Sequence, residues 1–176
     1  IETVLAAGSV GSPAILQRSG IGDPAFLQSQ GIPVAHALPG VGQNLQDHLQ
    51  LRSIYKVHGI KTLNRQANSL WGKAMMGLEY ALFRRGPLTM APSQLGLFAR
   101  SGNDMPTPDL EYHVQPLSLE KFGDPLHTFP AFTASVCDLR PQSRGYINIR
   151  DRDPASAPKI APCYLSHPAD REKAAQ

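Results

Sequence analysis

The sequence has little of what marks several common classes of protein. It holds two cysteines and one tryptophan in 176 residues, and no apolar run approaches the roughly 18 residues that a membrane-spanning helix needs. The formal net charge is only +3, and the basic residues are scattered apart from Arg84-Arg85. Nucleic-acid binding would need a clustered basic surface. We therefore expect no membrane span and no nucleic-acid partner.

The few cysteines and histidines show no pattern that is typical of a metal site. Cys137 and Cys163 have no Cys-x-x-Cys spacing, and Asp47-His48 are neighbours whose side chains point apart on an extended chain. We expect free thiols, as in a reducing compartment, and hence a cytoplasmic protein without a metal ion. The histidines considered are His36, His48, His58, His113, His127 and His167.

Proline and glycine, in contrast, are plentiful. The chain has 16 prolines and 15 glycines, which favour short elements separated by long loops. Hydrophobic residues make up 41% and charged residues 18%, as in soluble globular proteins. A chain of this length is expected to form about one domain with its own hydrophobic core.

Residue patterns predict an α+β fold with a mainly antiparallel sheet and a packed helix. Helical spacing over residues 66–84 places Trp71, Met75 and Leu78 on one stripe, which we expect to be buried. Two short helices are expected after caps at Ser12 and Asp23, each followed by proline. The predicted strands are 2–6, 49–57, 93–99, 109–115, 131–139, 146–150 and 159–161.

Two glycine-containing motifs lie in the first 48 residues. One runs from Gly8 to Gly22 as GSVGSPAILQRSGIG, and the other from Leu38 to His48 as LPGVGQNLQDH. Together they resemble the second signature of the glucose-methanol-choline (GMC) oxidoreductases, a family of flavin enzymes that oxidise alcohols. The resemblance implies FAD as the cofactor.

The same resemblance assigns cofactor contacts. Ala7, Gly8 and Ser9 correspond to a strand end that approaches the flavin in the family, and small residues there permit close approach. In the second motif, Asn44 and Asp47 are expected to position a loop against the flavin. Asn and Asp side chains also lock loops through bonds to nearby backbone, and the two interpretations are compatible.

The resemblance covers nearly the whole chain but only the middle of the family's length. No Gly-x-Gly-x-x-Gly loop for the FAD diphosphate is present, and the family's catalytic His is expected beyond Gln176. No catalytic residue is therefore expected within the chain. The expected division is a partial flavin-binding domain with its connecting loop at 1–48, a substrate-binding domain at 49–165, and the start of a further segment at 166–176.

A second candidate site lies on the strand at 109–115. Glu111, His113 and Gln115 alternate with apolar residues and share one face. That face is expected to meet either solvent or, as the family fold implies, the substrate cavity above the flavin. His127, in the loop before the next strand, is a further candidate for substrate contact.

The resemblance implies hydride transfer from the CH–OH group of a small alcohol to FAD. Choline dehydrogenase-like members are suggested by the segments 108–113 (PDLEYH) and 140–145 (RPQSRG). Two alternatives stay open: a hydroxynitrile-lyase-like protein of the same fold, and a non-catalytic fragment that self-associates. Unpaired strand edges and apolar patches favour association, most simply as a homodimer.

Overall fold

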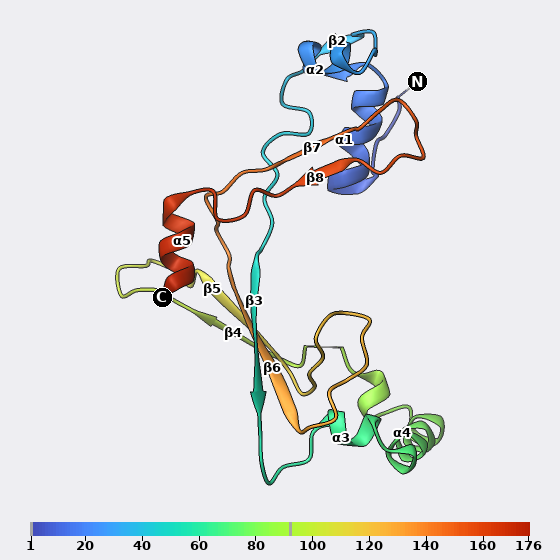
Figure 1. The fold of residues 1–176 in the computed structure, drawn as a ribbon, viewed down its shortest axis with the longest axis vertical. Coiled ribbons are helices and arrows are strands. Elements are labelled where there is room, and N and C mark those ends of the chain that lie inside the picture. The colour runs from blue at the N-terminus through green and yellow to red at the C-terminus, as the bar shows by residue number, and fades with distance from the viewer. Residues whose placement is uncertain (1, 92) are drawn as a thin grey trace. The chain divides into compact units, whose positions relative to one another are not determined.

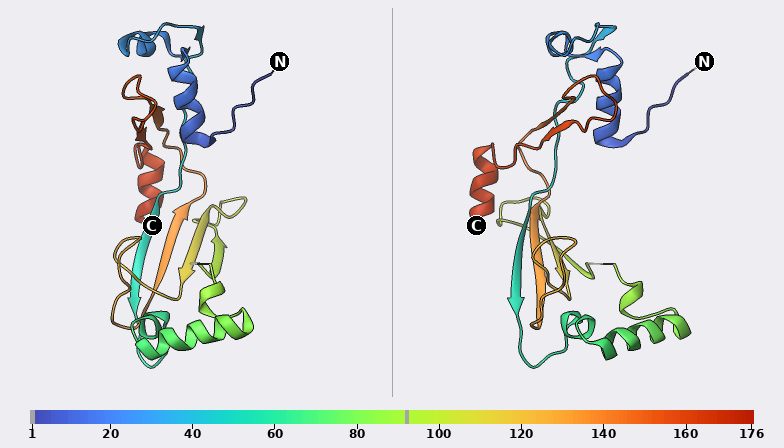
Figure 2. Two further views of the ribbon diagram at one scale, coloured as in Figure 1. Left: turned by 90° about the vertical axis from the view of Figure 1, so that its right-hand side faces the viewer. Right: turned by 45° about the vertical axis from the view of Figure 1, so that its right-hand side comes forward.

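The computed structural model of the protein describes residues 2–91 and 93–176, which form two compact units. The terminal unit comprises the residues up to Asp47 together with Pro141–Gln176, and the sheet unit comprises His48–Arg140. Figures 1 and 2 show the chain leaving the first unit, building the second, and returning. The expected substrate-binding stretch at 49–165 differs from this division, because residues 141–165 belong to the terminal unit.

The terminal unit is built from short elements. Three helices are α1 (Gly8–Arg18), α2 (Pro24–Ser29) and α5 (Pro168–Ala175). Strands β1 (Ile21–Gly22) and β2 (His36–Ala37) pair in parallel, while β7 (Tyr146–Asn148) and β8 (Lys159–Ala161) pair antiparallel. Its core consists of the buried side chains Ala14, Leu27, Ile32 and Ile149.

Gln17 joins the two chain segments of this unit. The side chain is 1% exposed. Its amide nitrogen donates to the carbonyl of Val41, to the carbonyl of Ile147 and to Asn148 Oδ1, at 3.3, 3.1 and 3.2 Å, and its Oε1 accepts from the Ile149 N–H at 2.9 Å. A fully bonded amide in the core thereby fixes α1 against β7.

Gly42 allows a loop to approach β7 closely. Its φ is +80°, and a Cβ there would lie 2.1 Å from the Ile147 carbonyl oxygen and 2.6 Å from Gln17 Nε2. The Ile147 N–H in turn donates to the Gly42 carbonyl at 2.7 Å. A larger residue at 42 would therefore be both strained and obstructed.

Near the carboxyl end, Asp170 of α5 holds the segment that leads to β7. Its carboxylate is buried and accepts from the N–H of Gln142 at 2.8 Å, from the N–H of Ser143 at 2.7 Å and from the Ser143 hydroxyl. Burial opposes the charged form, but these hydrogen bonds outweigh it and hold the pKa of Asp170 below its usual value.

Several expectations for the first residues are wrong in detail. Residues 2–6 form no strand and are exposed, because nothing in the described chain pairs with them. The first helix begins at Gly8, so Ser12 is not its N-cap; the Ser12 hydroxyl instead accepts from the Ala7 N–H at 3.1 Å. The cap at Asp23 is confirmed, since its carboxylate accepts from the Phe26 N–H at 2.8 Å.

The sheet unit contains a four-stranded antiparallel sheet in the order β3–β6–β5–β4. The strands are β3 (Gln50–Lys56), β4 (Leu95–Ala99), β5 (Leu110–Gln115) and β6 (Ala131–Asp138). The predicted antiparallel α+β character is thus present. The strand expected at 146–150 is not part of this sheet, because among the described strands β7 pairs only with β8.

The helices of this unit are α3 (Leu63–Ala67), α4 (Leu70–Phe83) and the short 3-10 helix η1 (Pro87–Thr89). Figures 1 and 2 show α4 beyond the end of the sheet rather than over a face. The expected burial of its apolar stripe is wrong: Trp71 is 75% exposed and Leu78 51%. None of the described helices has the length and hydropathy that crossing a membrane requires.

Asn64 anchors the loop that precedes β6. This fully buried side chain donates to Ser118 Oγ at 2.8 Å and to the Phe129 carbonyl at 3.2 Å, and it accepts from the Ser118 N–H at 2.8 Å. Thr133 Oγ1 of β6 donates to the Leu117 carbonyl at 2.9 Å. The segment between β5 and β6 is therefore held to the sheet through buried polar contacts.

Candidate functional site

The predicted flavin-contact residues lie at the start of α1. Ala7 is the N-cap position, and Gly8 and Ser9 open the helix; all three are exposed. Gly8 has a φ of +73°, and nothing lies within 4 Å of the position that a Cβ would take. The expected strand end is therefore the start of a helix, the Ala7 N–H is already bonded to Ser12 Oγ, and contact of these three residues with the flavin stays a prediction.

Asn44 and Asp47 are held in the terminal unit by the loop around them. Leu45 and Gly145 exchange two backbone hydrogen bonds, at 2.9 and 2.8 Å. Asn44 adopts a φ of +61° and is exposed, while Asp47 accepts a hydrogen bond from the Tyr164 hydroxyl. The loop is thus held by the Leu45–Gly145 backbone pair and by the distant Tyr164, whereas a lock through bonds from Asn44 and Asp47 to nearby backbone, like the flavin contact, stays a prediction.

Tyr164 is affected by this contact. Its pKa is raised, first by the hydrogen bond to Asp47, then by partial burial and by the negative charge of the same carboxylate. All three favour the neutral phenol. Tyr164 therefore acts as a hydrogen-bond donor that holds Asp47 in place.

The polar face of the sheet is arranged by strand register. Glu111, His113 and Gln115 of β5 lie opposite Cys137, Ser135 and Thr133 of β6. The expectation that the three share one face is confirmed. Their surroundings differ, however, because Gln115 is buried and donates to Ser93 Oγ at 3.3 Å, so it meets neither solvent nor an open cavity.

Glu111 and His113 are both half-buried, and the carboxylate Oε1 lies 3.4 Å from His113 Nε2. Arg52 of β3 lies on the same face, opposite Ser135, with its guanidinium carbon 4.9 Å from the centre of the Phe122 ring. One guanidinium nitrogen of Arg52 is buried without a hydrogen-bond partner in the described chain. Sequence reasoning missed Arg52, because no local pattern signals a cation on this face.

His127 is oriented by a separate set of contacts. Its Nδ1 lies 3.1 Å from Ser118 Oγ, its Nε2 lies 3.7 Å from Glu120 Oε2, and its ring stacks on Phe129 with centroids 4.7 Å apart. Ser118 is also bonded to Asn64. No hydrogen bond of the described chain joins His127 to Glu111, His113 or Gln115, so the structure does not bring these four candidates into one contact network.

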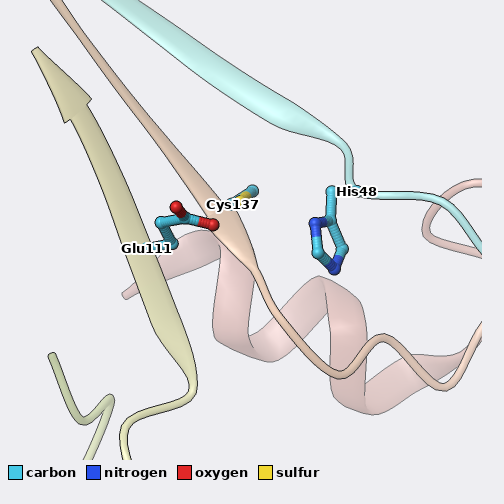
Figure 3. Close-up of side chains that lie close together, drawn as sticks. All are labelled: His48, Glu111 and Cys137. Carbon is cyan, nitrogen blue, oxygen red and sulfur yellow. The ribbon is translucent and has the colours of Figure 1, made fainter. Parts of the chain in front are cut away.

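A further cluster consists of His48, Glu111 and Cys137, whose donor atoms all lie within 4.8 Å of one another (Figure 3). Burial raises the pKa of the Cys137 thiol, and the charges of Glu111 and Asp138 raise it further. No spacing in the sequence signals this cluster, since its members come from three different segments.

Comparison with known proteins identifies the family. A model of GMC oxidoreductases matches residues 1–50. Oxygen-dependent choline dehydrogenase 1 of Chromohalobacter salexigens is 37% identical over 170 residues, which cover 96% of this chain. The chain belongs to the GMC oxidoreductase family. The oxygen-dependent choline dehydrogenase of Escherichia coli K12 is 36% identical over 169 residues, again covering 96% of the chain.

This GMC chain spans about 30% of the length of these curated relatives. Solved structures show the same fold. Pyridoxine 4-oxidase from Mesorbium loti superposes with a TM-score of 0.73 at 24% identity, covering 96% of this chain and 29% of that one. Formate oxidase of Aspergillus oryzae RIB40 gives 0.85 at 20% identity, covering 98% and 34%.

GMC enzymes use FAD, and the residues at the start of α1 are compatible with it. The exposed segment from Ala7 to Ser9 presents no side chain larger than a hydroxymethyl group, and the open space beside Gly8 leaves room for a ligand. The diphosphate would have to be held elsewhere, because the chain has no Gly-x-Gly-x-x-Gly loop.

Proposed function

We propose that this chain is part of an FAD-dependent oxidoreductase that oxidises the CH–OH group of a small alcohol. The supporting observation is the 37% identity to a choline dehydrogenase, sustained over 96% of the chain. Because the chain spans 30% of that relative, the activity is assigned to the longer protein to which such a segment belongs.

In this proposal the terminal unit contributes to the flavin-binding domain. The backbone of Ala7, Gly8 and Ser9 would hold the flavin together with the loop of Asn44, whose backbone lies in the left-handed region. Tyr164 keeps Asp47 in its loop position through the hydroxyl–carboxylate bond. Bound FAD supplies the acceptor for the hydride that leaves the alcohol carbon.

The sheet unit contributes the substrate-binding domain. Glu111 and His113 lie on its polar face and offer an acceptor and a donor to an alcohol. Gln115 lies on the same face but is buried and bonded to Ser93 Oγ, so it serves to position the strand. His127, which contacts Ser118 and stacks on Phe129, is a further residue proposed to line the substrate cavity. The base that takes the hydroxyl proton is assigned to a residue outside this chain.

Choline is the alcohol that the curated relatives favour. Its quaternary ammonium would be attracted by the Glu111 carboxylate and opposed by the Arg52 guanidinium, which lie on the same face of the sheet. Comparison of choline with its uncharged isostere, 3,3-dimethylbutan-1-ol, separates recognition of the charge from recognition of the alcohol.

The test uses the complete product of the gene. We expect it to carry flavin after desalting and to reduce an artificial electron acceptor when choline is added. His113→Ala should raise KM severalfold with a smaller effect on kcat, whereas His58→Ala, an exposed histidine of the same unit, should change neither. The 176-residue chain by itself should retain no flavin. A complete product without flavin, or without alcohol-dependent reduction, would refute the proposal.

A further inference from the structure

A cluster of metal-ligating side chains lies at one end of the four-stranded sheet. His48 offers a ring nitrogen, Glu111 a carboxylate oxygen and Cys137 a sulfur, and these atoms lie within 4.8 Å of one another. All three residues belong to the sheet unit. Cys137 is 2% exposed, Glu111 is half-buried and His48 is exposed, so the cluster extends from the core to the surface.

The strand register creates the cluster. Glu111 of β5 lies directly opposite Cys137 of β6, and such cross-strand partners project to the same face with Cβ atoms roughly 5 Å apart. Cys137 is also the partner of Gln50 at the start of β3. His48 precedes Gln50 by two residues, and Figure 3 shows its ring turned towards the other two side chains.

The His48 ring is oriented by the backbone. Its Nε2 lies 3.2 Å from the Leu139 carbonyl oxygen. A carbonyl accepts only, so this contact requires the proton on Nε2 and leaves the Nδ1 lone pair to bind a ligand. Figure 3 shows the nitrogen next to Cγ on the side facing Glu111 and Cys137. Histidine ligands of metals commonly donate their other N–H in this way.

Glu111 has an outer partner of its own. Its Oε1 lies 3.4 Å from His113 Nε2, and a carboxylate has a second oxygen with which to bind an ion. His113 would thus hold the carboxylate in position, as outer-shell groups do around metal ligands.

We propose that His48, Glu111 and Cys137 form a binding site for a divalent ion of the zinc class. A donor set of one nitrogen, one sulfur and one oxygen suits Zn²⁺, and it disfavours Mg²⁺ and Ca²⁺, which take oxygen ligands. Three protein ligands leave the fourth tetrahedral position for water. Donor atoms around zinc lie roughly 3.5 Å apart, so the three side chains, whose donor atoms lie within 4.8 Å of one another, would have to draw together around the ion.

Binding requires the thiolate form of cysteine. The Cys137 S–H bond breaks, its proton passes to solvent, and the sulfur keeps the electron pair with which it binds the ion; no oxidant or reductant takes part. The ion would join the first residue of the sheet unit to β5 and β6. This site is separate from the flavin contact proposed at α1 but shares Glu111 and His113 with the proposed substrate-binding face; its test does not depend on flavin or on alcohol oxidation.

The test is titration of the chelator-treated 176-residue chain with Co²⁺, whose visible bands and thiolate-to-cobalt charge-transfer band report tetrahedral sulfur ligation. We expect one ion per chain. Cys137→Ser should abolish the charge-transfer band, and His48→Ala and Glu111→Gln should each weaken binding at least tenfold. Cys163→Ser removes the exposed cysteine and is the matched control that should bind normally.

Because His48 is exposed, His48→Ala tests the site without disturbing the core, and circular dichroism of each variant verifies folding. The proposal is overturned by absence of stoichiometric cobalt binding to the folded chain. It is equally overturned if the band persists in Cys137→Ser or disappears in Cys163→Ser, since cobalt would then be bound elsewhere.

Discussion

Replacement of Gln17 by Met should destabilise the terminal unit. Met preserves the length of the side chain but provides neither the amide donor nor the acceptor. The Ile149 N–H and the Ile147 carbonyl, both of which now bond to Gln17, would be left buried without that partner. Each orphaned group costs about 1–3 kcal/mol, so we expect a loss of about 3 kcal/mol.

At neutral pH, Gln17→Glu should destabilise the terminal unit more than Gln17→Met does. The oxygen that replaces the amide nitrogen would face the three oxygen atoms that now accept from it, at 3.1 to 3.3 Å. Repulsion and the burial of a charge would then add to the lost hydrogen bonds. Protonation of the new carboxyl restores one donor, so lowering the pH should recover part of the loss for this variant only.

Hydrogen exchange at the Ile149 amide is the direct assay, because that N–H donates to the Gln17 oxygen. A loss of about 3 kcal/mol corresponds to roughly hundredfold faster exchange. The control is Gln28→Met on the exposed side of α2, which should cost under about 0.5 kcal/mol. Equal effects of the two substitutions would refute the structural role assigned to Gln17.

Two further predictions concern ionisable groups. The pKa of Asp170 is lower in the folded state than in the unfolded state. Its contribution to stability is therefore complete above about pH 4 and is lost as the pH falls through the folded-state pKa. Urea titrations at several pH values should show this loss of stability, and the Asp170→Asn variant should not show it. Cys163, exposed, should react rapidly with a thiol reagent in metal-free protein, whereas the buried Cys137 should react only after urea unfolds the chain; comparable rates in the native chain would contradict its burial.

The sequence predicted those elements whose cause is local. The cap at Asp23 followed by Pro24 forms as expected, and the alternation in β5 and β6 identified two central strands of the sheet. Residues 2–6 did not form a strand, because a strand needs a hydrogen-bonding neighbour and apolar character cannot supply one. Periodicity likewise showed that α4 has an apolar stripe, but not what would cover it.

The candidate sites show the same distinction. That Glu111, His113 and Gln115 share a face follows from the strand period, but the burial of Gln115 depends on its distant partner Ser93. The cluster of His48, Glu111 and Cys137 depends on the register of β3, β6 and β5. Register is set by pairing between strands that are distant in sequence, so residue spacing along the sequence does not predict it.

The division of the chain also has a consequence for the order of folding. The sheet unit is one continuous segment and is complete once Arg140 has been synthesised. The terminal unit, in contrast, closes only when Ile149 reaches Gln17, 132 positions earlier, and when Asp170 reaches Ser143. During synthesis from the N-terminus the sheet unit can therefore fold first. Until the second segment of the terminal unit has been made, Leu27 and Ala14 of α2 and α1 lack part of the core that covers them, and chaperones can bind these exposed side chains.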